Sequence, residues 1–173
     1  MIDEKYKALA LFVESGIEGI RRTGLKVLSL RERHVKLLMP LKGNVNHVGI
    51  MYAGSLFTIG EVMGGAIFGA SFDMGRYYPL VKEVQIRFRR PALTDITLEA
   101  VLSEEQAVRI RTELEEKGKA DFTLDLELID ARGEAVSLVQ GIWQGRKMTP
   151  ELTVLLSQLS GRQAEVMTSD KAQ

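Results

Sequence analysis

Residues 44–61 have the sequence NVNHVGIMYAGSLFTIGE, in which a polar loop runs into an almost wholly apolar segment. The apolar segment continues to Phe72, and Glu61 is the only formal charge between Val48 and Phe72. Burying an isolated carboxylate among apolar side chains is costly unless the group has a partner or a chemical role. The stretch therefore predicts the centre of the fold and also the first candidate site.

The apolar segment predicts a long buried helix over residues 52–70, because it is longer than an ordinary strand. Its glycines lower the intrinsic helicity by up to about 1 kcal/mol each, and they let other parts of the chain approach closely. These glycines are Gly60, Gly64, Gly65 and Gly69. A membrane span is the alternative for this length, but Glu61 at the centre and the glycines disfavour it. We expect a helix that its own protein surrounds.

Amphipathic patterns flank this helix on both sides. Apolar residues recur at helical spacing over residues 3–22, and residues 25–39 predict a strand with a bulge or bend near 31–34. Further patterns predict strands and one charged helix; the strands are 81–90, 96–102, 120–128 and 134–146, and the helix is 104–117. We therefore expect an α+β fold in which a curved antiparallel sheet of about five strands wraps around the central helix.

The length of 173 residues suits one domain, which we place at residues 1–147 with the N-terminal helix included. Residues 148–173 are expected to form a C-terminal extension, partly helical over 151–159 or mobile. The charged N-terminus lacks the apolar core of a signal peptide, so we expect a soluble, cytoplasmic protein.

Composition excludes several kinds of site. The chain has no cysteine, which excludes disulfides, thiolate metal sites and cysteine nucleophiles. It has two histidines, so a histidine-rich metal site is not expected. Lysine plus arginine and aspartate plus glutamate both number 23, and this balance disfavours a broad nucleic-acid-binding surface.

Three motifs occur in a defined order. Asn46 precedes Tyr52-Ala53-Gly54 by six residues, and Glu61 follows Tyr52 by nine. A Pro-Ala turn follows the strand at 81–90, and an Asp-Ala-Arg-Gly turn precedes the last strand. Over residues 25–147 these motifs resemble those of the hotdog-fold acyl-CoA thioesterases, in the branch whose active site lies at the start of the central helix. The helix at 104–117 resembles that of uncharacterised, thioesterase-like members of the superfamily.

The resemblance implies catalytic roles for four residues. Glu61 would act as general base or nucleophile, with a pKa raised by its apolar setting. The backbone N–H groups of Ala53 and Gly54 would stabilise an oxyanion at the helix N-terminus. Asn46 would orient the water or the carbonyl. The structural alternatives are a salt bridge or hydrogen bond for Glu61, ordinary capping at the helix start, and an asparagine turn at Asn46.

Two positions depart from the family pattern. Tyr52 stands where many members have histidine, and Ala53 stands where they have the first glycine. A backbone N–H survives the change from glycine to alanine, so an oxyanion donor remains possible.

The resemblance also implies a substrate-binding set. Arginines at the end of one strand would bind the phosphates of coenzyme A, with a solvated strand face as the alternative; they are Arg87, Arg89 and Arg90. Ser55 and Thr58 lie on the same helical ridge as Glu61 and would line the acyl channel or bond to local backbone. His47 and Tyr52 would form a wall of the site.

We therefore expect acyl-CoA thioester hydrolysis at a subunit interface of a homodimer or homotetramer. No metal is expected, and no cofactor beyond the coenzyme A part of the substrate. The main alternative is a non-enzymatic acyl-CoA binder or sensor. A third alternative is an acyl-carrier dehydratase, because His47 lies fourteen residues before Glu61, but the flanking residues of that pattern are missing. Neither a nucleic-acid nor a membrane partner is expected.

Overall fold

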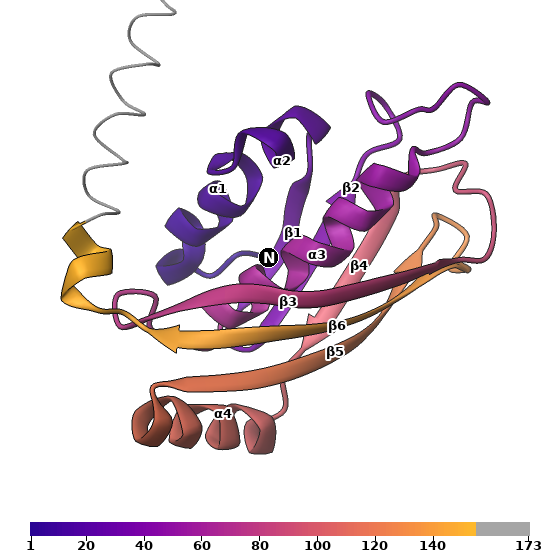
Figure 1. Cartoon of the computed structure of the whole chain (residues 1–173). Helices are drawn as coiled ribbons and strands as arrows, with labels where there is room; N and C mark the ends of the chain where they lie inside the picture. Colours follow the sequence, from indigo (N-terminus) through magenta and orange to yellow (C-terminus); the bar gives the residue numbers. More distant parts are fainter. Residues whose placement is uncertain (155–173) are drawn as a thin grey trace, which may run out of the picture.

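The computed structural model describes residues 1–154, which form a curved antiparallel sheet around one long helix (Figure 1). The strands are β1 (Lys26–Arg31), β2 (His34–Met39), β3 (Tyr77–Phe88), β4 (Ile96–Val101), β5 (Lys119–Ile129) and β6 (Ala135–Lys147). The helices are η1 (Glu4–Tyr6), α1 (Lys7–Ser15), α2 (Glu18–Thr23), α3 (Ala53–Gly69) and α4 (Glu104–Lys117). The strand order is β1-β2-β4-β5-β6-β3, with antiparallel neighbours throughout. The predicted α+β arrangement is confirmed.

Helix α3 is held by the sheet around it. Ten of its residues are buried, and it has no charged residue in its first or last turn. Strand β6 approaches closely where α3 has no side chain, because Val139 packs against Gly60 and the indole of Trp143 lies on Gly64. A side chain at Gly64 would overlap that indole. Tertiary packing thus offsets the low intrinsic helicity that the glycines cause.

The single strand predicted over residues 25–39 is wrong, because this stretch forms a hairpin. Strands β1 and β2 pair with each other, and the chain reverses at Glu32 and Arg33, where Arg33 has a φ of 55°. Leu30 and Val35 are neighbours across the two strands and are both buried. The change of phase that suggested a bulge therefore marks a turn, and the sheet has six strands.

The helix predicted over residues 3–22 is also interrupted. The chain forms the short η1, then α1, and restarts as α2 after Gly16 and Ile17. Gly24 ends α2 with a φ of 72°, a conformation that glycine adopts without strain. Figure 1 shows α1 and α2 beside α3. Leu9 of α1 packs against Gly69 of α3, so α1 docks directly on the central helix.

The later elements agree with their predicted positions. Helix α4 begins with a capping box between Ser103 and Gln106 and ends at Gly118. Strand β3 starts at Tyr77, before the predicted residue 81, and includes Pro79; a proline is tolerated there because β3 is an edge strand that pairs with β6. The helix predicted over 151–159 lies mostly outside the described residues. Among residues 1–154, no helix has the length and apolarity that a membrane crossing requires.

Candidate active site

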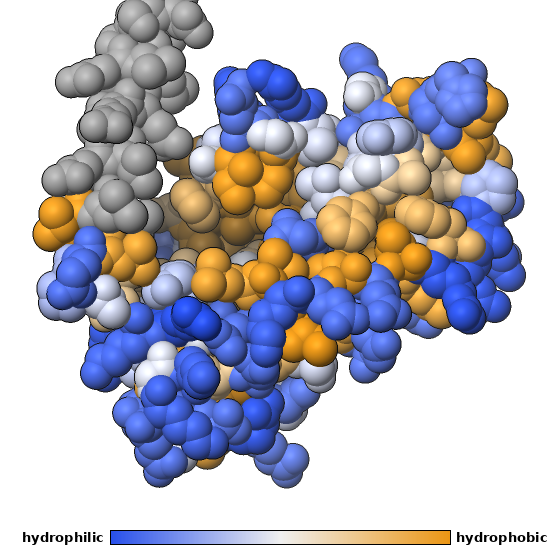
Figure 2. All heavy atoms as spheres, in the orientation of Figure 1, coloured by the Kyte–Doolittle hydropathy of each residue, from blue (hydrophilic) through white to orange (hydrophobic). Residues whose placement is uncertain are grey.

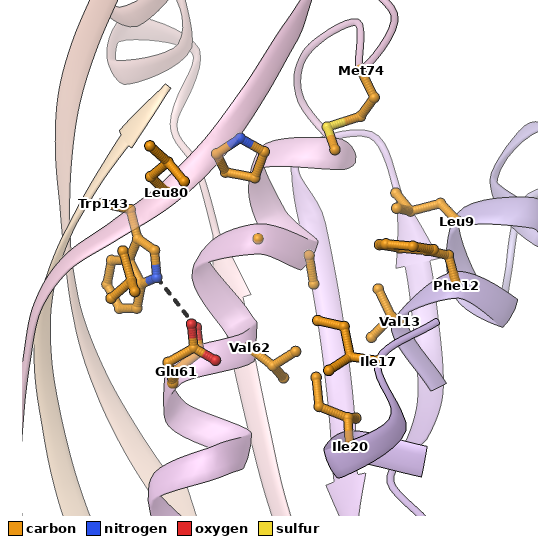
Figure 3. A pocket seen from close by; sticks show the side chains of 14 residues that line it. Leu9, Phe12, Val13, Ile17, Ile20, Glu61, Val62, Met74, Leu80 and Trp143 are labelled. Atoms are coloured by element: carbon orange, nitrogen blue, oxygen red, sulfur yellow. Dashed lines mark hydrogen bonds between the residues drawn. The ribbon is translucent and has the colours of Figure 1, made fainter. Parts of the chain in front are cut away.

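Glu61 lies in the wall of an apolar cavity of about 270 Å³ (Figure 3). The cavity lies between the N-terminal helices, α3 and the first half of β3, and Trp143 of β6 closes one side. Of the described residues that line it, Glu61 is the only charged one; the others are Leu9, Phe12, Val13, Ile17, Ile20, Val62, Gly65, Ala66, Met74, Pro79, Leu80, Val81 and Trp143. Figure 2 shows apolar side chains around a hollow in this part of the molecule.

The Glu61 carboxylate is half-buried, and burial raises its pKa above the ordinary value. Within residues 1–154 it has neither a hydrogen-bond partner nor an ion-pair partner. The backbone of the same residue is fixed, because Trp143 Nε1 donates a hydrogen bond to the Glu61 carbonyl oxygen at 3.2 Å (Figure 3). The backbone of Glu61 is thus held in place, while burial raises the pKa of its carboxyl, which is unpartnered among the described residues.

The N-terminus of α3 presents two free backbone donors. The N–H groups of Ser55 and Leu56 donate to the carbonyl oxygen of Tyr52, at 3.0 and 3.2 Å. Those of Ala53 and Gly54 have no acceptor among the described residues, and Tyr52 makes no side-chain cap. Unpaired N–H groups at a helix start favour an anionic oxygen. The Tyr52 ring covers Gly54 so closely that a side chain there would overlap it.

The polar side chains beside this helix start bond to their own loop and helix. Asn46 Oδ1 accepts from the backbone N–H of Val48 and Ile50, at 3.0 and 3.3 Å. Thr58 Oγ1 donates to the carbonyl oxygen of Gly54 at 2.8 Å. His47 is exposed on the same loop. In this chain the Asn46 side chain therefore forms an asparagine turn.

Asn44, which the sequence did not single out as a site residue, anchors this end of the helix. It is 6% exposed, and its Nδ2 donates to the carbonyl oxygens of Thr23 and Pro40, at 2.7 and 2.8 Å. Its Oδ1 accepts from Ser55 Oγ at 2.8 Å. The Ser55 hydroxyl therefore fastens α3 to the loop and is directed away from Glu61. No spacing rule reveals this role, because two of the three partners, Thr23 and Ser55, lie 21 and 11 residues from Asn44.

Glu61 and the free amides do not converge within one chain. Gly54 and Glu61 are seven residues apart on the same helix, which corresponds to about 11 Å along its axis. The helix start, with Tyr52 and Gly54, opens into a different hollow, which Asn46 and Thr58 also line. Glu61 and the start of the helix therefore line two separate hollows.

The predicted phosphate-binding arginines, Arg87, Arg89 and Arg90, lie at or just after the C-terminal end of β3. Val84 and Ile86 pack against the core, so Arg87, which alternates with them, lies on the outer face of the sheet. Arg90 forms an ion pair with Glu134 at 3.0 Å, and Arg89 is exposed. Residues 1–154 contain no cluster of three acidic or histidine side chains that could hold a metal ion.

The sequence did not predict the other walls of the cavity. Phe12 and Ile17 belong to a pattern that predicts an amphipathic helix. The pattern does not indicate which part of the protein the apolar face of that helix contacts. Trp143 belongs to the last predicted strand, and no pattern in that strand indicates that its ring lies on Gly64.

Comparisons with known proteins agree with this architecture. The model of a domain of unknown function, DUF4442, matches residues 20–144. A protein of unknown function from Pseudomonas aeruginosa, described as a probable thioesterase, is 44% identical, with a TM-score of 0.78 over 82% of this chain and 95% of that chain. No curated protein is similar enough to match.

Two more distant structures share the fold. A protein of unknown function from Chlorobaculum tepidum is 19% identical, with a TM-score of 0.74 over 83% of this chain and 95% of its own. A thioesterase from Haemophilus influenzae is 10% identical, with a TM-score of 0.63 over 80% of this chain and 88% of its own. The predicted hotdog fold is confirmed.

Proposed function

The chain belongs to the DUF4442 family, within the hotdog-fold thioesterase superfamily, and we propose that it hydrolyses an acyl thioester with Glu61 as the general base. One observation carries the proposal: among residues 1–154, Glu61 is an unpaired carboxylate and the only charge in the wall of an apolar cavity, and burial raises its pKa. A side chain with these properties is costly to keep without a chemical role.

In the proposed reaction Glu61 removes a proton from a water molecule, and the water oxygen attacks the thioester carbonyl carbon. The carbonyl electrons move to oxygen to form a tetrahedral oxyanion. When it collapses, the carbon–sulfur bond breaks and the proton held by Glu61 passes to the thiolate. The products are a carboxylic acid and a thiol, and Glu61 is again ionised.

Direct attack by Glu61 is the alternative route. It would form an acyl anhydride on Glu61 with release of the thiolate, and water would then cleave the anhydride. A single turnover in heavy-oxygen water distinguishes the two routes. Only the anhydride route can place heavy oxygen in the Glu61 side chain, which mass spectrometry of the peptide detects.

We propose that two copies of the chain build the complete site, with Glu61 from one and the free amides of Ala53 and Gly54 from the other. The spacing of about 11 Å along α3 supports this arrangement, because the two groups line separate hollows of one copy. The outer edge of β3 supports it as well. Among residues 1–154, strand β3 pairs with β6 alone, and Leu80, Val81 and Phe88 on it are 44%, 46% and 50% exposed. Another copy of the chain can cover this surface.

Mixing two inactive variants tests the base and the shared site together. Glu61→Gln removes the base, and Ala53→Pro removes one amide donor. Proline suits the first position of a helix, and Tyr52 before it has the extended conformation (φ −62°, ψ 134°) that a following proline requires. We expect each variant alone to release little thiol from acyl-CoA, and the mixture, after subunit exchange, to regain activity. A mixture that stays inactive although mixed oligomers form would show that the two groups do not act across an interface.

Coenzyme A is the proposed thiol carrier. Its phosphates would bind the exposed guanidinium groups at the end of β3, above all Arg89, since Arg90 is paired with Glu134. Arg89→Gln should raise KM for an acyl-CoA and leave KM for the same acyl group on a short thiol unchanged. Equal effects on both substrates would remove Arg89 from carrier binding.

A non-enzymatic acyl-CoA binder is the second candidate. The position of the Asn46 side chain favours it, because both bonds to Asn46 Oδ1 come from its own loop. Wild type that binds acyl-CoA in calorimetry but releases no thiol from any acyl-CoA would support this candidate over the enzyme.

A further inference from the structure

The N-terminal helices complete the cavity at Glu61. Leu9, Phe12, Val13 and Ile17 line it, and all four precede residue 20, where the match to the family model begins. We propose that α1 and α2 turn the space beside Glu61 into a slot for an unsubstituted apolar acyl group of medium length. This inference rests on the proposed thioesterase function and names its substrate class.

The floor of the slot is a place on α3 that no side chain fills. Three glycines of α3 differ in what occupies the space beside them. Trp143 occupies the space at Gly64, and Leu9 occupies the space at Gly69, where it would lie 3.0 Å from an added methyl group. At Gly65 the nearest atom to such a methyl would be Pro79 Cγ, at 4.0 Å. The slot therefore exists because Gly65 has no side chain and Pro79 of β3 comes no closer than van der Waals contact with a methyl group placed there.

The size of the slot indicates the length of its occupant. An apolar cavity of roughly 150 Å³ can hold benzene, so a cavity of about 270 Å³ corresponds by proportion to about ten carbon atoms. Among the side chains of residues 1–154 that line it, only Trp143 carries a polar hydrogen besides Glu61, and its Nε1–H already bonds to the Glu61 carbonyl oxygen. Away from the Glu61 carboxylate, a hydroxyl or amino group on the acyl chain would remain unpaired, so the slot should disfavour acyl groups substituted there.

Phe12 forms the wall across the slot from Glu61 and Trp143 (Figure 3). Its ring is folded back over Gly16, where any side chain would overlap it. The ring is 54% exposed, so it lies at the open side of the slot. We therefore assign the upper limit on chain length to Phe12 and the depth of the slot to Gly65.

The test compares kcat/KM for straight-chain acyl-CoAs from acetyl to palmitoyl. Wild type should prefer chains near decanoyl, and hydroxylated decanoyl-CoA should be a poorer substrate. Gly65→Leu fills the slot and should shift the preference to shorter chains, with a loss of about tenfold or more for each methylene that no longer fits. Gly65→Ala makes a smaller change in the same direction. Phe12→Ala should shift the preference to longer chains.

Leu11→Ala is the matched control, because Leu11 is on the same helix, is 66% exposed and does not line the slot. Its chain-length profile should equal that of wild type. If folded Gly65 and Phe12 variants also keep the wild-type profile, the slot does not hold the acyl group and the inference is overturned.

A binding experiment separates this inference from the proposed function. Calorimetry with the Glu61→Gln variant measures the affinity for octanoyl-, decanoyl- and palmitoyl-CoA without turnover. A preference for decanoyl-CoA that Gly65→Leu abolishes supports the slot even if wild type cleaves no thioester. Affinity that is independent of chain length overturns the slot, whether or not the protein is an enzyme.

Discussion

The two halves of α3 differ in how their polar side chains are paired. In the first turns, Ser55 and Thr58 are both hydrogen-bonded, and the buried Asn44 uses both of its side-chain atoms. Two turns later, Glu61 has no partner among residues 1–154 and lies in the cavity wall. Paired polar groups hold the helix in place, and the unpaired carboxylate remains available for chemistry.

Glu61→Gln gives the largest expected effect. It keeps the shape of the side chain and removes the base, and positioned bases contribute typically 10²- to 10⁴-fold to rate. We expect kcat to fall by roughly that factor, with a melting temperature equal to or above that of wild type, because an unpaired carboxylate no longer has to be buried. Steady-state thiol release and calorimetric melting measure the two quantities. A loss of stability without a loss of kcat would make Glu61 a structural residue.

Asn44→Ala tests the first half of α3, where the polar side chains are hydrogen-bonded. The change removes three hydrogen bonds and leaves the carbonyl oxygens of Thr23 and Pro40 without this donor. We expect the free energy of unfolding to fall by about 3 kcal/mol, since unsatisfied buried groups cost about 1–3 kcal/mol each. Denaturant melts measure this loss. Asn46→Ala is the control and should cost less, because Asn46 is more exposed and stabilises its own loop.

Two adjacent glycines of α3 test how closely the helix is packed at neighbouring positions. Gly64→Ala pushes a methyl group into the Trp143 indole, and we expect a loss of about 1–3 kcal/mol in the free energy of unfolding. Gly65→Ala adds the same methyl where the nearest atom is 4.0 Å away, so the better helix propensity of alanine should stabilise by up to about 1 kcal/mol. Thermal melts of both variants check the sign of each change in stability. Equal destabilisation would mean that the space beside Gly65 is filled.

The central helix and its lone charge could be predicted because both depend on local sequence. Residues 53–69 are apolar on every side, and Glu61 interrupts them. The β1–β2 hairpin was missed because Glu32 and Arg33 include none of the residues that usually mark a tight turn.

The walls of the cavity could not be predicted, because they depend on how distant elements pack. The pattern in α1 shows that Phe12 belongs to a helix, but only the docking of Leu9 on Gly69 brings that helix to Glu61. The hydrogen-bond partners of a side chain could not be predicted for the same reason. Asn44 and Asn46 look alike in the sequence, yet one anchors three segments and the other closes its own loop.

The smallest expected effect is the pH dependence of stability that Glu61 causes. Burial raises the pKa of its carboxyl in the folded state, so the folded protein binds more protons at this residue than the unfolded chain does between the two pKa values. Stability must then fall as pH rises from the unfolded value through the raised one. Glu61→Gln removes this contribution, so the variant should gain stability relative to wild type as pH rises through that window, and the gain should be constant above it. Denaturant melts at several pH values measure the difference. A constant difference across the window would mean that the carboxyl titrates at its ordinary pKa, and the contrast between the two halves of α3 would then lose its electrostatic part.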